Sequence, residues 1–193
     1  MRMSVGAPVD GRDGHLGTFQ RAVMEPETRQ ITHLVVRTGL FVRRNVVVPI
    51  DRLVAFHQDS DEIELDLTKD QIERMPDYIR AGDPDEPILR PADDTLLDVP
   101  ATSEPELVAA LRNVRDSLVD IHGGMPVECT DGTLGLVDEV WIDPDTCQVT
   151  GVQVRGGLLA LNRIDVPLDS EAHVTADRVV LSFPKARLTR PAA

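Results

Sequence analysis

The feature that most constrains this chain is a set of turn residues that recurs at one fixed spacing. Asp13-Gly14 returns as Asp131-Gly132, an offset of 118 residues between positions 13 and 131. Self-similarity at a fixed spacing indicates repeated structural units. The sequence therefore predicts two copies of one small module. The same offset also pairs Gly17 with Gly135, Pro26 with Pro144, Thr28 with Thr146, Thr32 with Thr150, Arg37 with Arg155, Gly39 with Gly157 and Pro49 with Pro167.

Short strands separated by turns account for each copy. Asp13-Gly14 is typical of a tight hairpin turn, and the segment 25–28 has a proline that presets the first corner of a second turn. In the first copy these signals predict strands near 18–24, 30–37, 46–48, 53–57 and 62–67. With about six short strands and little helix, each copy is expected to close into a small β-barrel.

Matched positions in the two copies indicate which side of each strand faces the core. Leu34 and Val36 correspond to aliphatic residues 152 and 154, whereas Val35 corresponds to Gln153. Because side chains alternate across a strand, the first two are expected inside and Val35 outside. By the same reasoning Val47, which corresponds to Asp165, faces outward.

Two helical segments are predicted between and after the strands. Thr68 and Gln71 have the spacing of a capping box, which starts a short helical turn. A second capping box at 103–106 precedes an apolar stripe and predicts an amphipathic helix at about 104–119. We therefore divide the chain into a first module at 1–76, a linker with this helix at 77–121, and a second module at 122–193.

Composition narrows the classes of partner. The net charge is −13, from 33 acidic and 20 basic residues. Such a charge repels a phosphate backbone. No apolar run approaches the ~20 residues of a membrane span, and the N-terminus lacks the apolar stretch of a signal peptide. We expect a soluble cytoplasmic protein that binds no nucleic acid and has no integral membrane segment.

The two cysteines, Cys129 and Cys147, are both in the second copy. They fall near opposite ends of a predicted strand, too far apart for the Cα separation that a disulfide needs. Two free thiols are expected.

The order of these motifs resembles the PRC-barrel family. Each copy has Asp-Gly-x-x-Gly, then an acidic-Pro-x-Thr turn, then a Val-rich strand ending in Arg, then a strand ending in Val-Pro. The family includes the cytoplasmic domain of the photosynthetic reaction-centre H subunit and the C-terminal domain of the ribosome maturation factor RimM. The resemblance covers residues 5–75 and 124–188. It implies tandem six-stranded β-barrels used for protein interaction, without catalysis.

Candidate metal and catalytic residues have few supporting patterns. No two of the five histidines have the spacing of a metal pair. The acidic segments 59–62 and 143–145 do not continue into a calcium-binding loop of the EF-hand type. No nucleophile elbow or phosphate loop is present. We predict no catalytic residues, no metal ligands and no cofactor.

Arginines cluster near equivalent strand ends and are candidates for contacts with an anion. Guanidinium groups bind carboxylates and phosphates through paired hydrogen bonds. In so acidic a chain, pairing with its own Asp and Glu side chains is the favoured interpretation. The candidates are Arg37, Arg43, Arg44, Arg155 and Arg163.

Apolar residues at hairpin tips and on one outer face form a candidate interaction surface. The favoured interpretation is that the tips fold over the barrel mouth and that the helix 104–119 covers the outer valines. The alternative is a docking surface, in which case changing Leu40 and Phe41 to Ser should abolish association without unfolding. The residues concerned are Val35, Leu40, Phe41, Val42, Val47, Leu158, Leu159 and Leu161.

These expectations combine into a mainly β chain of two PRC-like barrels acting as a non-catalytic interaction or scaffold module. Modules this small are marginal alone, so the two copies are expected to share an interface or to dimerise, and self-association as a homo-oligomer is expected. Two alternatives stay open. One is a ribosome-assembly adaptor that binds a basic ribosomal protein through complementary charge. The other is a site for a small ligand or metal between the barrels.

Overall fold

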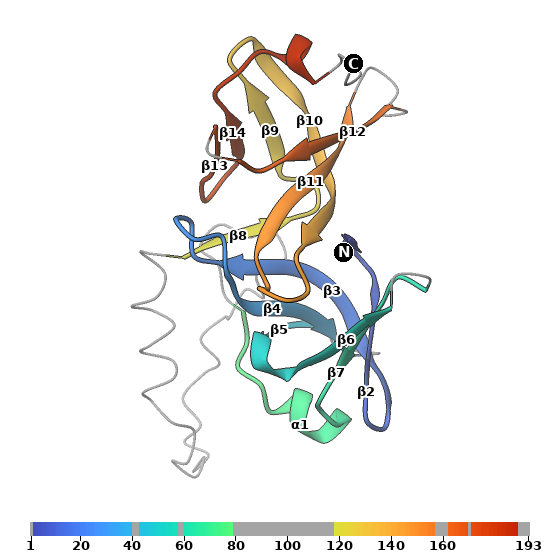
Figure 1. The fold of residues 1–193 in the computed structure, drawn as a ribbon. Helices are drawn as coiled ribbons and strands as arrows, with labels where there is room; N and C mark the ends of the chain where they lie inside the picture. Colours follow the sequence, from blue (N-terminus) through green and yellow to red (C-terminus); the bar gives the residue numbers. More distant parts are fainter. Residues whose placement is uncertain are drawn as a thin grey trace, which may run out of the picture.

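Two β-sheets, each of seven strands, contain most of the residues described in the computed structural model (Figure 1). The structure describes residues 2–39, 43–57, 60–78, 118–156, 162–169 and 171–188. The predicted mainly β architecture is confirmed. The predicted linker helix falls on residues outside these ranges, except at its end, where Val119 begins a strand.

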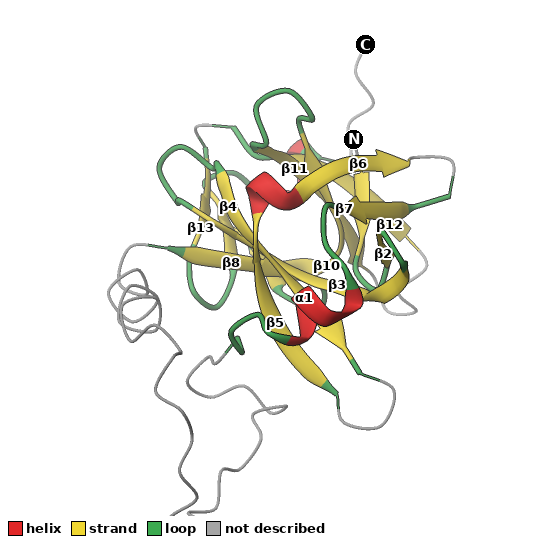
Figure 2. Ribbon diagram, turned by 90° about the horizontal axis from the view of Figure 1, so that it is seen from below, coloured by secondary structure: helices red, strands yellow, loops and turns green. Residues whose placement is uncertain are grey.

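The first sheet has the order β5-β4-β3-β2-β7-β6, with β8 paired to β3. All its pairings are antiparallel except that of β2 with β7. A 3-10 turn, η1, at Ile50–Arg52 separates β5 from β6, and α1 at Lys69–Glu73 lies against β3 (Figure 2). The strands are β2 (Pro8–Gly11), β3 (Gly14–Met24), β4 (Ile31–Thr38), β5 (Arg44–Pro49), β6 (Leu53–His57), β7 (Glu62–Leu65) and β8 (Val119–His122).

The second sheet repeats this plan in the order β12-β11-β10-β9-β14-β13, with β1 paired to β10. The bounds of β3, β4 and β5 and those of β10, β11 and β12 differ by the same 118 residues at both ends. The elements are β1 (Arg2–Ser4), β9 (Pro126–Cys129), β10 (Gly132–Ile142), β11 (Val149–Gly156), β12 (Asn162–Pro167), β13 (Ala172–Val174), β14 (Val179–Leu181) and the 3-10 turn η2 (Lys185–Arg187).

The strand orders differ from simple closed barrels. In the described residues each sheet is an open path, with β5 and β6 at the ends of the first and β12 and β13 at the ends of the second. Each sheet also holds one strand more than the six predicted, because a strand from outside its own repeat joins it.

Local turn chemistry follows the sequence closely. Gly11 pairs with Gly14, so a two-residue loop closes the first hairpin, and Gly14 has a φ of 110° that favours glycine. After β3 the backbone turns through residues 25–28, and the N–H of Arg29 donates to the C=O of Glu25 at 2.8 Å. The predicted capping box is confirmed, because Thr68 and Gln71 each accept a hydrogen bond from the other's backbone N–H.

The additional strand in each sheet comes from the other half of the chain. β1 precedes the first repeat but pairs with β10, placing Met3 opposite Val140. β8 precedes the second repeat but pairs with β3, placing Ile121 opposite Ala22. β1 and β8 therefore occupy equivalent places in opposite sheets, and we call them the exchanged strands.

The two halves also contact each other through equivalent residues, so an approximate two-fold axis relates them. Gln30 and Gln148, which are equivalent in the repeat, form an isolated β-bridge. The flanking hydrogen bonds match, because Ile31 N–H donates to Cys147 C=O and Val149 N–H donates to Arg29 C=O, each at 2.9 Å. The exchange is thus reciprocal, and each half contributes the same parts to the other.

One continuous hydrophobic core results from this arrangement. Met3 and Ile121, from the exchanged strands, are both fully buried, as are Met24 and Ile142 at the ends of the strands beside them. All four belong to one cluster that runs through both halves. Truncating a buried side chain of this size costs about 2–5 kcal/mol, so each exchanged strand contributes substantially to the sheet that it joins.

We expect the halves to stay together when the chain between them is cut. A site for a specific protease placed within residues 79–117 of the full chain would allow cleavage after folding. Because each half supplies a buried strand to the other, the cut protein should elute from a sizing column as one body and separate only in denaturant. Separation of the halves in native buffer would contradict the exchange.

Candidate interaction surface

The outward faces of the central strands carry most of the sequence-predicted site residues that the structure describes. In the first sheet, Arg21, Val35 and Val47 lie side by side across β3, β4 and β5. In the second sheet the same places hold Glu139, Gln153 and Asp165. Equivalent faces therefore have different chemistry, apolar and basic in one sheet and polar and acidic in the other.

The outer face of the first sheet is covered. Val35 is 0% and Val47 is 5% exposed, so neither offers an open apolar surface. Both lie outside the main core cluster, which agrees with their predicted outward direction. Sequence alternation identified the side of the sheet on which they lie, but it carried no information about what covers that side.

Segment 76–78 borders this covered face and lies along the edge of β5. The N–H of Val47 donates to Pro76 C=O at 2.9 Å, and the N–H of Tyr78 donates to Asn45 C=O at 2.7 Å. Arg44 holds the segment through an ion pair with Asp77 at 2.7 Å. The backbone edge of the first sheet is thus occupied by its own chain.

A buried ion pair joins β3 to the exchanged strand β8. Arg21 donates to Asp120 at 2.9 Å, and their side chains are only 15% and 7% exposed. The Arg21 guanidinium also lies 5.6 Å from the centre of the Tyr78 ring. Removing one partner of such a pair leaves an uncompensated buried charge, which costs about 3–5 kcal/mol.

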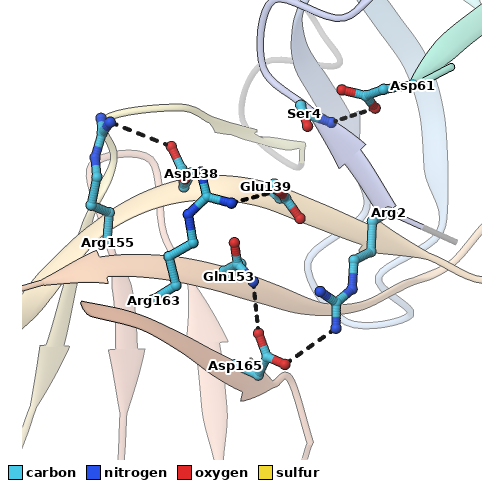
Figure 3. Close-up of polar contacts among 9 residues, drawn as sticks. All are labelled: Arg2, Ser4, Asp61, Asp138, Glu139, Gln153, Arg155, Arg163 and Asp165. Atoms are coloured by element: carbon cyan, nitrogen blue, oxygen red, sulfur yellow. Dashed lines mark hydrogen bonds and ion pairs between the residues drawn. The ribbon is translucent and has the colours of Figure 1, made fainter. Parts of the chain in front are cut away.

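The outer face of the second sheet is a network of opposite charges (Figure 3). Asp165 accepts from Arg2 at 3.2 Å and from the Gln153 amide at 3.0 Å. Arg163 lies 3.5 Å from Asp138 and 3.7 Å from Glu139. Figure 3 shows these side chains gathered over β10, β11 and β12, with Arg2 reaching in from β1.

Trp141 adds an aromatic ring to this face and lies over Gly151. A Cβ on Gly151 would come within 2.6 Å of the ring and 2.8 Å of the Val166 carbonyl oxygen. The Arg2 guanidinium lies 4.7 Å from the ring centre, in cation–π geometry. In the first sheet Val23 takes the place of Trp141 and His33 takes the place of Gly151. A small residue therefore faces a large one in both sheets, but on opposite strands.

Among the residues that the structure describes, two polar atoms of this face are buried without a hydrogen-bond partner, namely Trp141 Nε1 and Gln153 Oε1. Gln153 is only 6% exposed, although its outward position suggested an exposed residue. Buried polar atoms are nearly always satisfied in proteins, so these two atoms are exceptions.

In the described part of the chain, no strand pairs with the edge of the second sheet, whereas residues 76–78 pair with the equivalent edge of the first. β12 is equivalent to β5 and ends its sheet. At the place of Val47 the Asp165 side chain is 49% exposed, and the Arg163 side chain at the place of Asn45 is 61% exposed. Within the described residues no segment pairs with this edge.

The candidate arginines do not converge on one anion site. Arg37 donates to Asn45 at 3.3 Å, Arg44 is paired with Asp77, and Arg43 is exposed. Arg155 and Arg163 both approach Asp138 in the other sheet, Arg155 at 3.8 Å. The hairpin-tip residues Leu40, Phe41, Val42, Leu158, Leu159 and Leu161 lie outside the described residues.

Other titratable groups have local structural explanations. Burial lowers the pKa of His33, against an opposing effect of Asp51, so the neutral imidazole is favoured. Asp143 accepts hydrogen bonds from the N–H groups of Thr146 and Asp145, which lower the pKa of its carboxyl group and hold the turn. Cys129 and Cys147 are free thiols, as predicted, and burial raises the pKa of Cys129.

Within the ranges that the structure describes, the chain has neither a metal-binding cluster nor a membrane-spanning helix. There, no three His, Cys, Asp or Glu side chains are grouped so that they could hold a metal ion. No helix in the same ranges has the length and apolar character needed to cross a bilayer. No protein-family model matches this sequence, and no curated protein matches it.

We expect Gly151→Ala to displace the indole ring of Trp141. The added methyl group overlaps ring atoms and a carbonyl oxygen, and such overpacking typically costs about 1–3 kcal/mol. Because Trp141 is the single tryptophan, its fluorescence reports the change directly. Leu136→Ala, on the same strand at a 42% exposed position, is the control and should leave the emission unchanged. Unaltered emission and stability in Gly151→Ala would contradict this packing.

Proposed function

We propose that this chain is a non-catalytic protein-interaction module of the PRC-barrel type, with two barrel-like halves, that acts in the cytoplasm and associates with itself. The repeated turn and strand motifs support the family, together with the matching strand order of the two sheets. The reciprocal exchange supports a rigid scaffold, since both halves share one core.

The main support for an interaction role is a difference between two equivalent edge strands, β5 and β12. The edge of β5 is occupied by residues 76–78, whereas the Arg163 and Asp165 side chains on β12 are exposed. An uncovered edge presents backbone groups that pair readily with another strand. The network of charges beside β12 supplies side chains that select the partner.

The proposal predicts that the protein associates reversibly at moderate concentration. Sedimentation of the full chain over a wide concentration range should show the mass rising from one chain to two. The ion pairs beside β12 are largely exposed, so raising the salt concentration should weaken the association. A single-chain mass at every concentration and salt would contradict self-association.

A further inference from the structure

We infer that β12 pairs antiparallel with β12 of a second copy of this chain, about a two-fold axis at Ile164. The pairing would join the second sheets of two molecules into one continuous sheet. This inference rests on the proposed self-association, and it specifies the surface, the partner and the residues in contact.

The backbone geometry comes from the equivalent edge of the first sheet. There Val46 forms an antiparallel bridge with Asp77, and the flanking bonds use the C=O of Asn45 and the N–H of Val47. β12 pairs with β11 in the same register as β5 with β4. The C=O of Arg163 and the N–H of Asp165 therefore point away from β11, on either side of Ile164.

A two-fold axis at Ile164 makes this edge complementary to itself. It places the N–H of Asp165 opposite the C=O of the partner's Arg163. By symmetry, the N–H of the partner's Asp165 lies opposite the C=O of Arg163. The side chains on the outer face then alternate in charge, because Arg163 faces the partner's Asp165 and Asp165 faces the partner's Arg163. Opposite charges directly across strands stabilise a pairing, whereas like charges destabilise it.

The side chains involved are exposed enough to reach a second copy, although Asp165 already accepts hydrogen bonds from Arg2 and Gln153. Arg163 and Asp165 are 61% and 49% exposed, and the present ion pairs of Arg163, at 3.5 and 3.7 Å, are longer than hydrogen bonds. Ile164 is partly buried against the core. Pairing would place it across from the partner's Ile164 and bury the remainder of an apolar, β-branched side chain.

The occupied edge of β5 and the symmetry of the β12 contact also limit the size of the assembly. Because residues 76–78 occupy β5, the corresponding edge of the first sheet is closed to a second copy. A contact that uses the same surface on both molecules closes on itself as a dimer and does not extend into a fibre. The β12 pairing therefore predicts a closed dimer.

Charge reversals in the full chain test the pairing by sedimentation. Arg163→Asp puts two acids opposite each other at both contacts, and Asp165→Arg puts two arginines there. Each variant should raise the Kd of the dimer at least about a hundredfold, because like charges then face each other across strands. An equimolar mixture of the two should form a heterodimer, and the double variant R163D/D165R should form a homodimer again.

Matched controls separate these effects from net charge and folding. Arg178→Asp and Asp70→Arg change the net charge by the same amounts at exposed ion pairs away from β12, and should stay dimeric. Asp165→Arg also removes the bonds to Gln153 and Arg2. If Asp165→Arg does not fold, the comparison of the dimer Kd of Arg163→Asp with that of Arg178→Asp is the deciding test.

The possible results distinguish this inference from the broader proposal. Wild-type dimers that persist in both single variants would place the contact elsewhere and overturn the β12 pairing, while leaving self-association standing. Single variants that are monomeric, with no recovery in the mixture or the double variant, would also overturn it. A wild-type protein that is monomeric throughout would overturn both.

Discussion

The pairing of the exchanged strands is the interaction on which the rest of the structure depends. Each exchanged strand forms an ion pair with the sheet that it joins. In the first sheet Arg21 pairs with Asp120 of β8, and in the second Asp165 pairs with Arg2 of β1. Arg2 and Asp120 occupy equivalent places, so returning β1 to its own repeat would put Arg2 in the place of Asp120, next to Arg21. Like charges there would disfavour the unexchanged fold, in the same way that charges select partners in other paired structures.

The exchange explains how two small sheets acquire a stable core and different surfaces. A module of about 60 residues buries only about 60% of its surface and is marginal alone. Shared strands let both halves contribute to one core, and that core keeps matching aliphatic residues such as Leu34 and Val152 fully buried. The outer faces do not have to keep matching residues in the two sheets. The outer face of the first sheet carries valines and is covered, whereas that of the second carries a charged network beside an edge with which no described strand pairs.

Much of this fold was predictable because it follows from local chemistry. The turn after β3, the glycine at the first hairpin and the capping box at Thr68 each depend on residues close in sequence. The exchange was not predictable from strand patterns, because Met3 suits either sheet when the two are repeats of one another. The opposite charges of Arg2 and Asp120 were the one available signal. The burial of Val35 agrees with the favoured interpretation that its outer face is covered, but alternation along a strand says nothing of which segment packs there, and the helix expected to do so lies outside the described residues.

The most direct test of the exchange is an NMR measurement of cross-strand contacts in the full chain. The exchange predicts nuclear Overhauser effects between the backbones of Met3 and Val140, and between those of Ile121 and Ala22, which are register partners in the structure. Contacts of Met3 with Ala22 and of Ile121 with Val140 would show that each strand stays with its own repeat, and would rule out the exchange.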